Sequence, residues 1–173
     1  MTSNPTADTN MSPADRWPSI LASAGDLLGL NLSPDADGYV HLGVDALTAI
    51  HLQCTDDGRQ VTMFGVVAQA SASEVAARGL ELLQAQHFWT ATAGATFSWH
   101  EPTGELVLAR AVSVEPLVRD GAGPQAAITL LQGFADLLQS WQQQWRAWQE
   151  GGPADAAPGL QQAARPGLTG LMV

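Results

Sequence analysis

The sequence predicts an α+β fold in which a helix, three strands, a helix, two strands and a helix are arranged around a twisted antiparallel sheet. In three segments, apolar residues recur every three or four positions, as they do in amphipathic helices. Between these segments the apolar period falls to two, as in half-buried strands. The 173 residues suit one domain over 15–150. The remaining ends, 1–14 and the Gly/Pro-rich 151–173, are predicted to be flexible tails.

The first helix is predicted to begin at Asp15, a good N-cap residue, with Pro18 in its first turn and Gly29 as its stop. A turn over 34–38 follows it. Two strands come next, and their apolar residues alternate with polar or small ones. These apolar residues are Val40, Leu42, Val44, Ile50, Leu52 and Cys54.

A third strand, Gln60 to Ala68, follows the hairpin turn predicted at 56–58 and is apolar on both faces, so both faces must be covered. Ser71 and Glu74 then have the spacing of a capping box, in which each side chain bonds the other residue's backbone N–H. This spacing predicts a helix that runs to about His87.

Two further strands are predicted at about 92–100 and 105–112, joined by a tight turn over 101–104. A long final helix is predicted from about Pro124 to Gln149. It carries a heptad-like seam of apolar residues, for which core packing is the commoner use and a docking face the alternative. The seam consists of Ala127, Leu131, Phe134, Leu138, Trp141, Trp145 and Trp148.

The charge balance excludes several functional classes. Seventeen acidic side chains against seven basic ones give a net charge of −10, which argues against nucleic-acid binding. The chain has no lysine, which removes a Walker-A loop and Schiff-base chemistry. The single cysteine, Cys54, excludes an internal disulfide and fits a reducing compartment. Without a signal peptide or a run of about 20 apolar residues, we expect a cytoplasmic protein and no membrane span.

No catalytic or metal-binding motif is complete. His100-Glu101 begins like a zinc-protease motif, but the second histidine is missing. The segment from Asp35 to Gly38 begins like a calcium loop and then enters a strand, so we expect a turn there. His41 and His51 are placed to face each other across the first hairpin, and we expect ordinary strand histidines rather than a metal site.

Three runs resemble the central signature of the class I type III secretion chaperones, the Tir-chaperone (CesT-like) family. They are LLQAQHFW at 82–89, TAGATFSW at 92–99 and TGELVLAR at 103–110. The run LLGL at 27–30, the pair Val44-Asp45, the acidic balance and the long final helix resemble that family as well. The likeness covers about residues 16–149. The tryptophan-rich helix end and the Gly/Pro-rich tail depart from it.

This resemblance implies a homodimeric, non-enzymatic chaperone without cofactors. Its partners would be the N-terminal segment of a secreted effector, held extended, and the ATPase of the secretion apparatus. The implied client-binding residues are Leu21, Leu27, Leu28, Leu30, Val40, Leu42, Ile50, Leu52, Val61 and Met63. The implied dimer interface comprises Gly79, Leu80, Leu83, Ala95, Phe97 and Trp99.

Two other functions fit the same sequence pattern. A dimeric adaptor or regulatory protein of this fold, unrelated to secretion, would show the same periodicities. A small α+β enzyme or ligand-binding protein would need convergent polar groups in a pocket, and the sequence supplies no such set. The presence of an effector segment among the bound partners distinguishes the chaperone from the adaptor.

Overall fold

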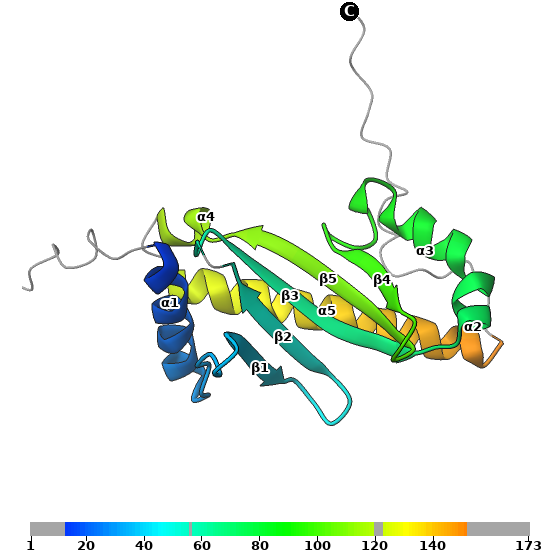
Figure 1. The fold of residues 1–173 in the computed structure, drawn as a ribbon, viewed down its shortest axis with the longest axis horizontal. Coiled ribbons are helices and arrows are strands. Elements are labelled where there is room, and N and C mark those ends of the chain that lie inside the picture. Colours follow the sequence, from blue (N-terminus) through cyan, green and yellow to red (C-terminus); the bar gives the residue numbers. More distant parts are fainter. Residues whose placement is uncertain (1–12, 56, 120–122, 152–173) are drawn as a thin grey trace, which may run out of the picture. The chain divides into compact units, whose positions relative to one another are not determined.

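The computed structural model describes residues 13–55, 57–119 and 123–151, and it has the predicted α+β fold (Figure 1). Its elements are α1 (Pro13–Leu28), β1 (Tyr39–Gly43), β2 (Ala49–Cys54), β3 (Gln60–Gln69), α2 (Ala72–Ala77), α3 (Gly79–Gln86), the 3₁₀ turn η2 (His87–Trp89), β4 (Thr96–His100), β5 (Glu105–Ser113), α4 (Glu115–Arg119) and α5 (Gly123–Gln149). The five strands are hydrogen-bonded in the order β1-β2-β3-β5-β4, so β1 and β4 are the edge strands. Most of the two predicted tails, and Asp56, lie outside the described residues.

The chain packs as two compact units, which are described separately. Unit 1 comprises the described residues within 1–63 and 111–134, and unit 2 those within 64–110 and 135–173. In unit 1 the core is formed by α1, the antiparallel β1–β2 hairpin, the start of β3 and the first part of α5. The largest buried side chains there include Trp17, Leu21, Leu32, Ile50, Leu52, Val61, Met63 and Phe134. They come from the predicted apolar positions of the helix and the strands, apart from Leu32, which lies in the connecting loop.

Unit 2 is organised around tryptophans of the second half of α5. Trp141 is almost fully buried, meets the ring of Phe97 edge to face at 4.8 Å, and donates its indole N–H to the Ala91 carbonyl (3.2 Å). Trp148 packs against Trp145 with 5.9 Å between ring centroids. All seven residues of the predicted α5 seam are buried within the chain, so the seam serves as core rather than as an exposed docking face.

Several boundaries differ from the prediction. The first helix begins at Pro13, so Asp15 lies inside it rather than at its N-cap. The capping box of Ser71 and Glu74 is confirmed, but the helix it opens is interrupted at Arg78, where α2 ends and α3 begins. The guanidinium of Arg78 lies 5.3 Å from the Trp148 ring centroid and donates to the Trp148 carbonyl. This tertiary contact has no signal in the local sequence.

The strand predicted from Thr92 begins only at Thr96. Residues before it form a turn in which Ala93 and Gly94 have φ values of 48° and 87°, outside the range of an extended strand. The short elements η2 and α4 were not predicted, because neither is long enough to show a period.

The end of α1 is a Schellman motif, and it requires glycine at two positions. The N–H of Leu30 bonds the carbonyl of Gly25 (2.9 Å), and the N–H of Gly29 bonds that of Asp26 (3.4 Å). Gly29 has φ of +67°, as the predicted stop requires. Folding the chain back in this way brings the Leu30 carbonyl to 2.5 Å from the position of a Cβ at residue 25. Any side chain at residue 25 therefore collides with backbone.

We expect Gly25→Ala to destabilise the protein by about 1–3 kcal/mol, since the added methyl group displaces the returning backbone. The matched control is Gly133→Ala in α5, where a Cβ meets nothing within 4 Å. That substitution should stabilise the protein by about 0.5–1 kcal/mol through helix propensity. Urea unfolding monitored by circular dichroism measures both. Equal effects of the two substitutions would contradict the described motif.

Candidate protein-binding surfaces

Unit 1 exposes an apolar surface at the end of α1. Three leucines are exposed there, with 66% of Leu27 accessible; we call Leu27, Leu28 and Leu30 the α1 surface. The Schellman motif produces this arrangement, because it ends the helix within a leucine-rich segment and turns Leu30 outward. Beside it lies an open hollow of about 410 Å³ with a mixed lining, which includes Leu30 as well as the polar Asp26 and Asn31. Exposed leucines of this kind can bury apolar side chains of another chain.

The edge strand β1 offers backbone groups next to this unit's sheet. Asp35 donates its N–H to the Tyr39 carbonyl (2.7 Å) and accepts the Tyr39 N–H at Oδ1 (2.9 Å), so these Tyr39 groups point away from β2. Because this direction alternates along an antiparallel strand, the N–H and C=O groups of His41 and Gly43 also point to the outer side. An extended peptide can pair with such groups as an added strand.

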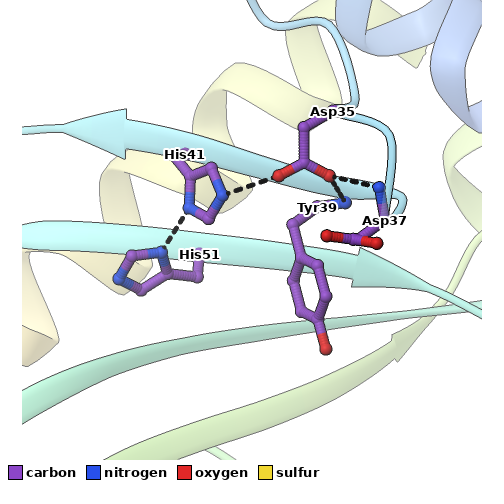
Figure 2. Close-up of polar contacts among 5 residues, drawn as sticks. All are labelled: Asp35, Asp37, Tyr39, His41 and His51. Carbon is purple, nitrogen blue, oxygen red and sulfur yellow. Dashed lines mark hydrogen bonds and ion pairs between the residues drawn. The ribbon is translucent and has the colours of Figure 1, made fainter.

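Polar side chains gather on one face of the same hairpin (Figure 2). His41 and His51 are directly opposite in the β1–β2 register, as predicted, with 2.7 Å between their Nδ1 atoms. The other ring nitrogen of His41, Nε2, lies 3.0 Å from Oδ2 of Asp35. The pKa of Asp35 is lowered, first by the backbone N–H of Tyr39 and then by the His41 ring and the backbone N–H of Asp37. Asp35 is therefore an ionised anchor for both the turn and the histidine.

Unit 2 exposes a second apolar surface, formed by α3 and η2. Four large apolar side chains are exposed there, with 78% of Phe88 accessible; we call Leu80, Leu83, Phe88 and Trp89 the α3 surface. Phe88 and Trp89 have φ values of 49° and 54°, a left-handed conformation that side chains of this size rarely adopt. Strain of this kind is commonly retained where it presents a functional group.

The other edge strand, β4, is partly covered. The side-chain Oε1 of Gln86, the last residue of α3, accepts the Phe97 N–H at 2.8 Å. Phe97 itself is half-buried against Trp141, and Trp99 is held by its indole N–H on the Ala70 carbonyl (3.0 Å). Unit 2 therefore presents side chains for contact with a partner, while at Phe97 the backbone N–H of its edge strand is already bonded.

The profile of the Tir chaperone protein (CesT) family matches residues 19–148 of this chain. The chain belongs to the CesT family. This membership confirms both the family resemblance and the chaperone function that the sequence predicted. No curated protein sequence matches the chain.

Solved structures with a similar fold include three complexes. The first is the crystal structure of the ExsC–ExsE complex, with 18% identity and a TM-score of 0.60 over 77% of this chain and 96% of that chain. The second is the HopA1–SchA chaperone–effector complex, with 18% identity and a TM-score of 0.54 over 74% and 91%. The third is the Yersinia pestis type III secretion chaperone SycH with a fragment of YscM2, with 15% identity and a TM-score of 0.50 over 70% and 98%. At these identities the likeness concerns the fold.

The structure separates the predicted client-binding residues into two groups. Leu27, Leu28 and Leu30 are exposed and Leu42 is half-buried, whereas the remaining six lie in the core of the folded chain. The six are Leu21, Val40, Ile50, Leu52, Val61 and Met63. They occupy the inner face of α1 and of the strands, so within the folded chain they support the surface instead of forming it.

The predicted dimer residues are also divided. Leu80 and Leu83 are exposed, Gly79, Phe97 and Trp99 are half-buried, and Ala95 is fully buried within the chain. The predicted set did not include Phe88 and Trp89, which are also exposed and stand in the run that carried the resemblance. Two adjacent aromatic residues directly after a helix were the available signal.

Within 13–55, 57–119 and 123–151, no group of three or more His, Cys, Asp and Glu side chains is placed to hold a metal ion. No helix among 13–28, 72–86, 115–119 and 123–149 combines the length and apolarity needed to cross a membrane.

We expect Asp35→Ala to lower the urea midpoint at pH 7 by removing the bonds to Tyr39, Asp37 and His41. The folded-state pKa of Asp35 lies below its ordinary value of 3.8, so its carboxylate stabilises the fold above that pH. This contribution is lost as the pH falls through the folded-state pKa, and the two proteins should converge there. Asp37→Ala is the control, since Asp37 bonds Asp35 through its backbone N–H, which the variant keeps. A difference between wild type and Asp35→Ala that persists undiminished at pH 2–3 would contradict this role.

Proposed function

We propose that this chain is a homodimeric, cytoplasmic, non-enzymatic chaperone that holds the N-terminal segment of a type III secreted effector in an extended, secretion-competent state. The observation that carries the proposal is the CesT family match across residues 19–148. Two of the structures that share its fold are described as a chaperone–effector complex and as a type III secretion chaperone with a bound fragment. Delivery of the client to the ATPase of the secretion apparatus would complete this role.

The α1 surface and the β1 edge are the proposed client site. Leu27, Leu28 and Leu30 supply apolar area, and the outward backbone groups of His41 and Gly43 supply hydrogen bonds for an added strand. A segment that is extended and has apolar side chains can use both kinds of contact, whereas a folded domain would expose neither its strand backbone nor its core residues. The features of unit 1 therefore favour an unfolded client.

The α3 surface is the proposed dimer contact. Its four apolar side chains, Leu80, Leu83, Phe88 and Trp89, are large and exposed, and two of them are aromatic, a residue class enriched in protein interfaces. The residues proposed for pairing and those proposed for client binding do not overlap, so each copy in a dimer keeps its own set of client-binding residues. Two equivalent client sites in one dimer increase the effective concentration for a single long segment.

The net charge of −10 is compatible with this role. Like charges keep a protein with exposed leucines from associating with itself without specificity, and they speed the capture of basic client segments. The same charge makes an acidic segment a poor client.

We expect Leu27→Asp combined with Leu30→Asp to abolish client binding without unfolding the protein, because both side chains are exposed. The measurement is co-expression with effectors encoded beside this gene, followed by size exclusion and calorimetry with the N-terminal segment that co-purifies. Ser23→Asp, on an exposed position of α1, is the control for added charge. Retained binding by the double variant would move the client site away from α1.

We expect Leu83→Asp to convert the dimer into a monomer, since it would place a charge in the apolar contact. Light scattering coupled to size exclusion measures the mass. Gln84→Asp adds the same charge at the neighbouring exposed position of α3 and should leave the dimer intact. An unchanged dimer for Leu83→Asp, or an equal effect of both variants, would place the interface elsewhere.

A further inference from the structure

His41 and His51 form a cross-strand pair whose rings are joined by an Nδ1–Nδ1 hydrogen bond. The two residues are directly opposite in the β1–β2 register, and the outward direction of the neighbouring Tyr39 backbone makes theirs a non-hydrogen-bonded pair. Side chains approach most closely at such pairs. Their Nδ1 atoms lie 2.7 Å apart, and the rings meet edge to face (Figure 2).

Asp35 fixes which nitrogen of His41 carries the proton. An ionised carboxylate only accepts hydrogen bonds, so Nε2 of His41, 3.0 Å from Oδ2 of Asp35, must be the donor. In the neutral ring Nδ1 is then the atom with the free lone pair, and it points at Nδ1 of His51. A carboxylate on the far nitrogen of an imidazole is the arrangement that orients histidine metal ligands.

The distance between the two nitrogens favours one class of ion. Metal–imidazole bonds of about 2.0 Å put two cis ligands of a square-planar ion about 2.8 Å apart, and two ligands of a tetrahedral ion about 3.3 Å apart. The observed 2.7 Å is close to the first value. Imidazole nitrogen suits Cu²⁺ and Ni²⁺, which prefer square-planar or tetragonal sites, whereas Zn²⁺ would require the rings to separate.

We propose that His41 and His51 form a two-histidine chelate for a square-planar divalent ion, Cu²⁺ or Ni²⁺, through their Nδ1 atoms, with Asp35 as the orienting residue. Water occupies the remaining coordination positions. Before binding, His51 donates its Nδ1 proton to His41. On binding, the Nδ1–Nδ1 hydrogen bond breaks and its proton moves to Nε2 of His51, so that both rings remain neutral. The rings then turn so that both Nδ1 lone pairs converge on the ion. More than half of the His41 side chain is accessible, so the ion can enter from solvent. The proposal stands on this geometry and does not depend on the client-binding function.

The test is a titration of the untagged full-length chain with Ni²⁺ by calorimetry, and with Cu²⁺ by electron paramagnetic resonance. We expect one ion per chain and a Cu²⁺ spectrum with two equivalent nitrogen ligands. His51→Ala should weaken binding on the order of 100-fold by removing the chelate. Asp35→Asn should weaken it about tenfold by releasing the orientation of His41.

The control is His100→Ala on β4, an exposed strand histidine without a histidine opposite, whose register partner is Glu105. This variant should bind as tightly as the wild type. Circular dichroism establishes that each variant is folded. Absence of binding at millimolar Ni²⁺ and Cu²⁺, or equal affinity of the wild type and a folded His51→Ala variant, would overturn the proposal.

Discussion

The backbone groups along the two outer strands are the constraint on which the surfaces of this protein depend. A sheet that does not close leaves N–H and C=O groups at both edges, and these groups must bond to water, to side chains or to another chain. At β4 the amide of Gln86 takes the Phe97 N–H. At β1 the turn residue Asp35 bonds both backbone groups of Tyr39: its N–H donates to the Tyr39 carbonyl, and its carboxylate accepts the Tyr39 N–H. The outward backbone groups of His41 and Gly43 come next along the strand. Each edge is thus partly closed by the chain's own side chains and turns, and at β1 the proposed client site lies just beyond the closed position.

The two apolar surfaces arise from different local structures. In unit 1 a glycine-dependent helix end turns leucines outward, and in unit 2 a left-handed pair of aromatic residues follows α3. Neither surface is a by-product of a poorly packed core, because the cores beneath them contain fully buried tryptophan, leucine and methionine side chains. Exposed apolar groups above a well-packed interior are the pattern of a protein that binds other chains.

Periodicity alone predicted most of the fold. The apolar positions of β1 to β3 and of α5 show clear periods because burial selects them, and Ser71 with Glu74 marked a helix start through purely local bonds. The helix break at Arg78 was missed, although Gly79 follows it; the Arg78 side chain there contacts Trp148, 70 residues away, a contact with no periodic signal. The start of β4 was predicted four residues too early, because nothing in the sequence marks Ala93 as a residue with a left-handed backbone.

The surfaces were harder to predict than the fold. Leu21 and Leu28 lie on the same predicted stripe, yet Leu21 is fully buried and Leu28, the last residue of α1, is exposed. Periodicity identifies the stripe but does not tell where along it the core ends. The sequence placed His41 opposite His51, since hairpin register follows from alternation. It did not reveal that Asp35, in the preceding turn, would fix the histidine ring.

The conformation of Phe88 and Trp89 has a consequence for engineering this protein. Glycine or asparagine would relieve the left-handed backbone at both positions, so a search for thermostable variants would favour those replacements. Each such change would also delete a large part of the apolar area beyond α3. Variants selected only for heat resistance would therefore lose side chains of the proposed dimer contact, and selection for assembly must accompany selection for melting temperature.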